Sequence, residues 1–191
     1  MDKLDKAVSY LSGAMEMVSD HGVEWRRKFI DLSVKAGLKI DYIDPTDKPG
    51  GIEVKIGENK QYQSDLKLNQ KWAELREYVG AYRRYDLRFV DLSDFVIASV
   101  NPKVPQWGTA NEVYEAERQH KPIFFLCDGG LANMPNWLFD LVDLPEDGKR
   151  CNVFASLESL IDELVGYNEG TFPLTKEWVL VRKHIELQRK L

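Results

Sequence analysis

Two almost wholly apolar segments, Phe95–Val100, in which only Ser99 is polar, and Pro122–Cys127, most constrain how this 191-residue chain folds. A strand that is apolar at every position must be covered on both faces, which is typical of parallel sheets between two layers of helices. Shorter strand candidates alternate with segments that have helical spacing of apolar side chains. We expect strands at 7–12, 39–43 and 152–155, and helices over 22–36, 65–87, 109–119 and 157–165. The alternation predicts an α/β fold, namely a Rossmann-like or flavodoxin-like three-layer sandwich whose mostly parallel sheet has about five strands.

The length fits a single domain over residues 1–191, which we expect to bury about 70% of its unfolded surface without disulfides or a structural metal. The two cysteines, Cys127 and Cys151, lie in apolar runs, so we expect buried, reduced thiols. Two segments fall outside the strand–helix alternation. Residues 46–64 are polar and predict a functional loop or mobile insertion, and residues 174–191 predict a C-terminal helix docked on this domain or on a second subunit.

Composition argues against several classes of function. A net charge of -5 disfavours binding to a nucleic-acid polymer, because phosphate neutralisation needs a surplus of Lys and Arg. It does not exclude a small phosphorylated ligand held at a helix N-terminus. No apolar stretch approaches the roughly 18 residues of a membrane span, and the charged N-terminus is unlike a signal peptide. We therefore expect a cytoplasmic protein without a membrane partner.

Several familiar motifs of metal, nucleotide-binding and catalytic sites are missing from the sequence. The histidines at 21, 120 and 184 lack metal-ligand spacing, and the chain has no Gly-x-Gly-x-x-Gly fingerprint after its first strand, no P-loop and no Gly-x-Ser-x-Gly elbow. We therefore expect neither a metal nor a cofactor. What remains are carboxylates near the carboxyl ends of the strands, where ligands bind on parallel sheets. That rule selects residues 12–16, 44–47, 100–112 and 127–136.

Glu112 stands out among these carboxylates. The segment Gly108-Thr109-Ala110-Asn111-Glu112 predicts a helix that starts after Gly108 with Glu112 in its first turn, where the helix dipole would keep the pKa of the carboxyl low. An ionised, oriented carboxylate suits nucleophilic attack on a sugar carbon with oxocarbenium character. The same segment also matches a capping box, with Thr109 as the N-cap and Glu112 as a favourable acid. The local pattern alone favours the capping box.

Other candidates also have purely structural interpretations. Asp94 precedes the strand at 95–100, so it is expected at the amino end of the sheet as a turn or cap residue. Asp44 follows the second strand on the correct side, although Asp-Pro is also a common turn. Tyr10 inside the first strand is expected in the core. Three tryptophans could wall a pocket for a flat base or simply pack: Trp25, Trp107 and Trp137.

Four segments in a fixed order carry a family resemblance: Tyr10-Leu11-Ser12-Gly13, Asp44-Pro45, Asp91 to Ala98, and Gly108 to Ala116 with Lys121 to Phe124 after it. Together they resemble the nucleoside 2-deoxyribosyltransferase family and its nucleotide N-glycosidase relatives. The resemblance covers roughly residues 8–157 and leaves out the 46–64 loop and the C-terminal helix.

The resemblance implies an enzyme that cleaves or transfers the N-glycosidic bond of a (deoxy)nucleoside. Glu112 would be the nucleophile that attacks the anomeric carbon and forms a glycosyl ester, from which a second base or water takes the sugar. Asp94 would contact sugar or base and assist proton transfer, and Tyr10 would hold the glutamate. Further positions that would bind the small-molecule nucleoside or nucleotide are Gly13, Trp25, Asp44, Gln106, Gly108, Thr109 and Asn136.

Two positions depart from relatives that act on nucleoside monophosphates. Glu16 stands where those relatives often have a Gly-Ser-rich turn with an arginine, and Gln106 replaces a serine. Glu16 would repel a phosphate. Because the family is typically oligomeric, we also expect a homo-oligomer in which Asn133, Asn136 or the tail closes a neighbour's pocket. Two alternatives stay open, a nucleoside 5′-monophosphate N-glycohydrolase and a non-catalytic nucleotide-binding module.

Overall fold

Five parallel strands form one sheet in the order β2-β1-β3-β4-β5 in the computed structural model, which describes residues 3–47, 56–172, 178 and 183. The strands are β1 Val8–Gly13, β2 Asp41–Ile43, β3 Phe95–Val100, β4 Ile123–Cys127 and β5 Val153–Phe154. The predicted α/β fold with a parallel sheet is confirmed. The chain order along the sheet reverses between β1 and β3, which makes that pair the switch point where ligands bind on such sheets.

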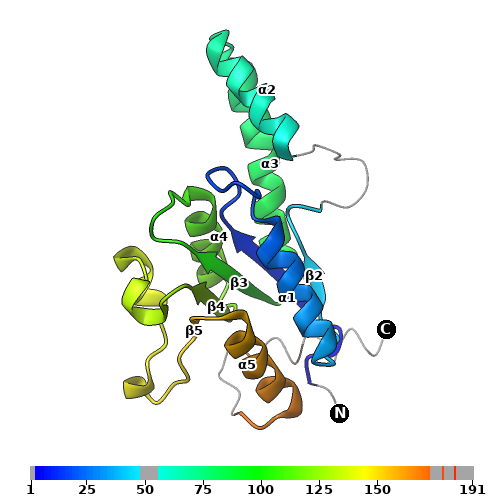
Figure 1. Ribbon diagram of the computed structural model, residues 1–191, viewed down its shortest axis with the longest axis vertical. Helices are drawn as coiled ribbons and strands as arrows, with labels where there is room; N and C mark the ends of the chain where they lie inside the picture. Colours follow the sequence, from blue (N-terminus) through cyan, green and yellow to red (C-terminus); the bar gives the residue numbers. More distant parts are fainter. Residues whose placement is uncertain (1–2, 48–55, 173–177, 179–182, 184–191) are drawn as a thin grey trace.

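Helices cover both faces of the sheet, as Figure 1 shows. One face carries α1 and α5, and the other carries α3 and α4. Their bounds are α1 Val23–Lys35, α3 Trp72–Leu92, α4 Trp107–Arg118 and α5 Leu157–Glu169. The sandwich thus has the three layers that the alternation of strands and helices predicts.

The side chains of β3 explain why the two long runs are almost entirely apolar. Phe95 and Ile97 pack in the core beneath α1 and α5, whereas Val96 and Ala98 pack in the core beneath α3 and α4. Successive side chains of a strand face opposite sides of the sheet, so a central strand is apolar wherever helices cover both of its faces.

Short 3₁₀ turns rather than a helix connect β4 to β5. They are η1 Gly130–Asn133, η2 Asn136–Leu141 and η3 Pro145–Asp147. The longest of the three is η2, with six residues. Leu138 is its buried residue and packs in the core beside α3 and α4, which anchors the connection.

A helical arm replaces part of the predicted loop. The expectation of a loop over 46–64 is wrong from residue 56 onward, because α2 spans Ile56–Leu68; residues 48–55 lie outside the described residues. The single helix expected over 65–87 is also wrong: it breaks at 69–71, where Gln70 has a φ of 54°, and α3 then continues to Leu92. Tyr62 of α2 packs on Tyr78 of α3, with ring centroids 5.0 Å apart.

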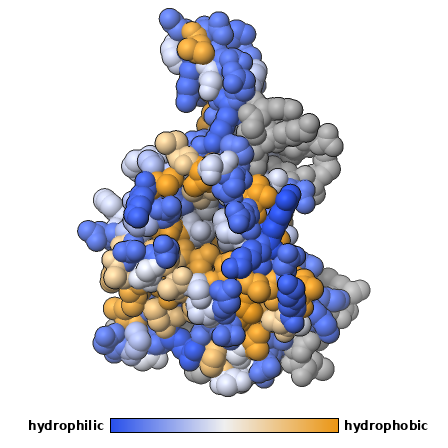
Figure 2. Space-filling model, in the orientation of Figure 1, coloured by the Kyte–Doolittle hydropathy of each residue, from blue (hydrophilic) through white to orange (hydrophobic). Residues whose placement is uncertain are grey.

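The arm formed by α2 and the first half of α3 projects from the body of the protein in Figure 1. Figure 2 shows hydrophilic residues over most of it. The helix over 56–68 was missed because a helix that buries little apolar surface against the body has no strong apolar stripe in its sequence.

Trp178 closes the core beneath α1 and α5. Its ring centroid lies 5.4 Å from that of Phe95, 5.7 Å from Phe124 and 4.8 Å from Tyr167. Most of the C-terminal helix predicted over 174–191 lies outside the described residues, so that helix stays a prediction. Cys127 and Cys151 are free thiols, as expected, but only Cys127 is buried, whereas Cys151 is partly exposed. Within the described part of the chain, no helix combines the length and apolar character that a membrane span requires.

Candidate active site

Glu112 is the buried carboxylate around which the candidate site is built, with 7% of its surface exposed. Tyr10 Oη donates a hydrogen bond to Glu112 Oε1 at 2.9 Å, and the Ser12 hydroxyl donates one to Oε2. Tyr10 and Ser12 are two residues apart in β1, so their side chains face the same side of the sheet. Ser12 is paired in register with Ala98 of β3. The carboxylate thus lies at the β1–β3 switch point, which is the place where sheets of this kind bind ligands.

The helix that carries Glu112 begins earlier than the sequence pattern indicates. The first residue of α4 is Trp107 and its N-cap is Gln106, whose side chain makes no capping bond. Thr109 is buried inside the first turn. The capping-box interpretation is therefore wrong, because a hydroxyl inside a helix cannot serve as its N-cap. Glu112 lies in the second turn and reaches across to β1.

Burial decides the ionisation of Glu112. Removal from water raises its pKa from 4.5 to about 7, and the hydrogen bond from Ser12 only partly offsets this rise. The charge of Asp86 raises the pKa further, whereas the Tyr10 bond and the charge of Arg26 lower it. The low pKa expected from the helix dipole is wrong, because desolvation outweighs that local effect. Burial also raises the pKa of Tyr10, which therefore stays protonated and able to donate.

Asp86 is a site residue that sequence reasoning missed. It belongs to α3, is 6% exposed, and acts through its charge on Glu112, Tyr10 and Tyr82. In the sequence it is one of several charged residues in a helix, and such residues usually face solvent. A weak signal was present, because Asp86 stands one helical turn before Val90 and therefore on the same face as that buried residue.

Arg26 of α1 is fully buried and holds the backbone at the carboxyl end of β1. Its guanidinium donates to three backbone carbonyls, those of Leu11 at 3.0 Å, Gly13 at 3.1 Å and Gly22 at 2.6 Å. The Asp44 carboxylate lies 3.6 Å from Nε. Arg26 therefore fixes the chain on both sides of Ser12 and ties it to the end of β2. Burial of this charged group is tolerated because each of the three guanidinium nitrogens donates a hydrogen bond.

Two glycines allow the chain to turn tightly between β1 and α1. A Cβ atom on Gly13 would lie 3.1 Å from Trp25 Cζ2 and 3.2 Å from Ser99 Cβ, so a side chain here would crowd Trp25 and Ser99. Gly22 has a φ of 74°, and a Cβ there would lie 2.4 Å from the carbonyl oxygen of Ala14. Gly13 and Trp25, both predicted to contact substrate, pack against each other here.

Asp94 lies away from Glu112, at the amino end of the sheet. Its Oδ2 accepts a hydrogen bond from the Val8 N–H at 2.8 Å, and its own N–H donates to the Val8 carbonyl at 2.7 Å. Val8 is the first residue of β1, whereas Ser12, which binds Glu112, is near the other end. The structure therefore places Asp94 where its position before the strand indicates, and does not bring it to the site as the family resemblance implies.

A cavity of about 420 Å³ opens at the carboxyl ends of β1 and β3, and Glu112, Tyr10 and Ser12 are not among the residues that line it. Its wall includes the β1–α1 loop, the start of α1 and the loop before α4. Gln106 orders this wall, because its amide donates to the Ser99 carbonyl at 2.9 Å and its oxygen accepts from the Asn101 N–H at 2.6 Å. Among the described residues, no group of three or more His, Cys, Asp or Glu side chains is arranged to hold a metal ion.

The other predicted positions are spread over the carboxyl edge of the sheet. Asp44 follows β2 and orders the turn there by accepting the Thr46 N–H at 2.8 Å. Gly108 lies in the first turn of α4. Asn136 is exposed at the start of η2, and its contact with a neighbouring subunit stays a prediction. Two of the three tryptophans face solvent, Trp107 at 86% and Trp137 at 85% exposure.

The fold has a counterpart among solved structures. The chain is similar to a 2-desoxiribosyltransferase from Leishmania mexicana, with a TM-score of 0.52 and 18% sequence identity. The similarity covers 84% of this chain and 98% of that chain. No protein-family model and no curated protein matches the sequence. At this level of identity the match shows a shared fold, so the protein has the fold of a deoxyribosyltransferase.

Proposed function

We propose that the protein is an enzyme that cleaves or exchanges the N-glycosidic bond of a nucleoside, with Glu112 as the nucleophile. The observation that carries the proposal is the geometry of that carboxylate. It is buried at the β1–β3 switch point, and both of its oxygens accept hydrogen bonds, from Tyr10 and Ser12. The fold shared with a deoxyribosyltransferase supports the same class of reaction.

The proposed reaction is a double displacement at C1′ of the sugar. Glu112 attacks C1′, and an ester C–O bond forms while the C1′–N bond breaks; the electron pair of that bond leaves with the base, which takes up a proton. In the second step a nitrogen of another base, or the oxygen of water, attacks C1′ and loses a proton. The ester bond then breaks and its electron pair returns to Glu112.

The residues around Glu112 have separate roles in this scheme. Tyr10 and Ser12 orient the carboxylate, and Arg26 keeps the backbone of Ser12 in place through the carbonyls on either side. Asp86 adds negative charge next to the nucleophile. That charge opposes ionisation of Glu112 but favours the positive charge that develops on the sugar in the transition state. In this proposal Asp94 supports the fold and does not contact substrate.

Incubation of the protein with a 2′-deoxynucleoside and a second free base, followed by chromatography, tests the proposal. Base exchange is expected from a transferase, and free base with free sugar from a hydrolase. Acid quenching during turnover followed by mass spectrometry should show a pentosyl adduct on the peptide that contains Glu112. Absence of turnover over a broad panel of nucleosides would leave a binding module and refute the proposed chemistry.

A matched pair of variants separates the nucleophile from general charge effects. Glu112→Gln should reduce turnover by at least ~10³-fold and remove the adduct. Glu117→Gln makes the same change on the exposed side of the same helix and should leave turnover intact. An active Glu112→Gln protein would contradict the assignment, as would equal losses in both variants.

A further inference from the structure

One row of side chains runs along α3 from the helical arm to the candidate site. Tyr78, Tyr82 and Asp86 are spaced four residues apart and therefore lie on one face of the helix. Tyr62 of α2 packs on Tyr78 with ring centroids 5.0 Å apart, and Tyr78 packs on Tyr82 at 5.9 Å. Asp86 is buried at the other end of the row, where its charge acts on Glu112. The row thus connects the projecting arm of Figure 1 with the proposed nucleophile.

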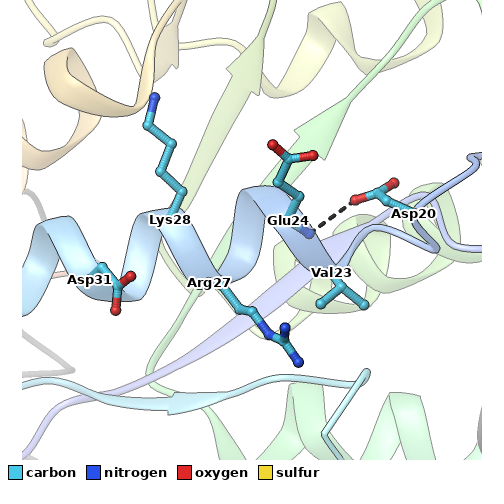
Figure 3. Close-up of a pocket in the computed structure, with 6 residues that line it drawn as sticks. All are labelled: Asp20, Val23, Glu24, Arg27, Lys28 and Asp31. Atoms are coloured by element: carbon cyan, nitrogen blue, oxygen red, sulfur yellow. Dashed lines mark hydrogen bonds between the residues drawn. The ribbon is translucent and has the colours of Figure 1, made fainter.

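Tyr82 also joins α3 to the loop between β1 and α1. The buried guanidinium of Arg26 fixes the β1 end of this loop, and Asp20 fixes the α1 end by accepting the Glu24 N–H at 2.9 Å, the bond drawn in Figure 3. Glu16 lies between these two ends and accepts a hydrogen bond from the Tyr82 hydroxyl at 3.5 Å. Tyr82 therefore holds the middle of the loop that continues from the carboxyl end of β1.

The Tyr82 hydroxyl lies among negative charges. Burial raises the pKa of Tyr82 to about 12, and the charges of Glu16 and Asp86 contribute to this rise, so the hydroxyl keeps its proton and remains a donor. The groups that act on Glu112 through charge or a hydrogen bond are Asp86 of α3, Tyr10 and Ser12 of β1, and Arg26 of α1. Without Tyr82, the two like charges beside it would move apart and water would enter between the loop and α3.

We propose that Tyr82 is a positioning residue of the candidate site, through which the helical arm keeps Asp86 and the loop after β1 in place around Glu112. The arm thus affects turnover without touching the substrate. The inference rests on the proposed function where it concerns turnover. The arrangement around Glu112 is a property of the folded protein, however, and it is measurable without any substrate.

The titration midpoint of Glu112, followed by NMR of its carboxyl carbon, tests the proposal in the absence of substrate. Tyr82→Leu removes the ring and the hydroxyl and should move the midpoint to lower pH by at least ~0.5 pH unit, because less burial and a more distant Asp86 both favour the ionised form. Tyr82→Phe removes only the hydroxyl and should give a smaller shift in the same direction. Tyr62→Ala, at the far end of the row, should also lower the midpoint, whereas Tyr62→Phe keeps the ring and should not.

Matched controls and a double-mutant cycle separate positioning from a general loss of structure. Tyr85→Phe removes a hydroxyl from the same helix, and Asp20→Asn changes the loop at its α1 end; neither should move the midpoint. Tyr82→Leu should have much less effect in the Asp86→Asn background, because the two residues act on Glu112 through one contact. In turnover assays, Tyr82→Leu should lower kcat by at least ~3-fold with a smaller change in KM.

The outcomes distinguish this inference from the proposed function. A midpoint that neither Tyr82→Leu nor Tyr82→Phe moves overturns the inference, and so does an equal shift in the Tyr85→Phe control. A shift in Tyr82→Leu without one in Tyr62→Ala overturns the role of the arm. Full additivity with Asp86→Asn overturns the action through Asp86. If the midpoint moves as expected and no nucleoside is turned over, the positioning around Glu112 stands and the proposed function fails.

Discussion

Replacing Glu112 with glutamine is expected to stabilise the protein at alkaline pH while it removes the proposed nucleophile. The carboxyl group has a pKa of about 7 in the folded protein against 4.5 for an unperturbed group, chiefly because burial disfavours its charged form. Below pH 4.5 the group is protonated in both folded and unfolded states and costs nothing. As pH rises from 4.5 to 7, the unfolded state ionises first, so the free energy of unfolding falls.

The magnitude follows from the size of the pKa difference. About 2.5 pKa units correspond to about 3 kcal/mol at pH values above 7, and most of this cost develops between pH 5 and pH 8. Glutamine has nearly the same shape and no charge, so it avoids the cost. The hydrogen bonds from Tyr10 and Ser12 to a neutral amide are weaker than those to a carboxylate, and this loss reduces the stabilisation by ~1 kcal/mol. The net gain at pH 8 should be about 2 kcal/mol.

Urea unfolding followed by tryptophan fluorescence at pH 5 and pH 8 measures this effect. The difference in unfolding free energy between Glu112→Gln and wild type should grow toward pH 8, whereas Glu117→Gln should show no such growth. A difference that is independent of pH, or a variant less stable than wild type at pH 8, would refute the reasoning. In that case the carboxylate would be stabilised by its surroundings rather than strained by burial.

Three further substitutions test the surroundings of the site. Asp86→Asn removes a charge that raises the pKa of Glu112, so the acid limb of the kcat/KM profile should move to lower pH; a limb that stays or rises would contradict this. Arg26→Lys cannot reproduce the guanidinium bonds to the β1 carbonyls and should lower both turnover and the unfolding free energy, the latter by at least ~2 kcal/mol in urea titrations. Asp94→Asn weakens the hydrogen bond from the Val8 N–H and should lower the free energy of unfolding by ~1–3 kcal/mol with kcat/KM nearly unchanged. Lost turnover at unchanged stability would instead support the assignment of Asp94 as a contact to the sugar.

The parallel sheet could be predicted because its signal is local. The run at 95–100 is apolar at every position except Ser99 because both of its faces are covered, and that requirement is visible without any knowledge of the partners. The arm escaped prediction for the opposite reason. The helix over 56–68 projects from the body, so its sequence carries no strong apolar stripe.

The location of the candidate site could also be predicted, but its composition could not. Glu112 was selected because parallel strands bring their carboxyl ends to one edge, which is a consequence of topology alone. Tyr10 was assigned to the site only by the family resemblance, and the structure shows its hydroxyl bonded to Glu112. Asp94 was assigned to the site by resemblance, and the structure places it at the other end of the sheet. Asp86 was overlooked because a charged residue inside a helix looks like a surface residue until the helix is packed.

The amino-acid sequence by itself determined the layered α/β architecture and the edge of the sheet where chemistry would take place. Both follow from periodicity and strand direction, which are properties of neighbouring residues. Only the tertiary structure decided that Glu112 lies in the second turn of its helix and that its pKa is raised rather than lowered. It also decided that Arg26 donates its hydrogen bonds to backbone carbonyls. These features depend on how much water and how many charges surround each group after folding. They are set by side chains that are distant in sequence and close in space.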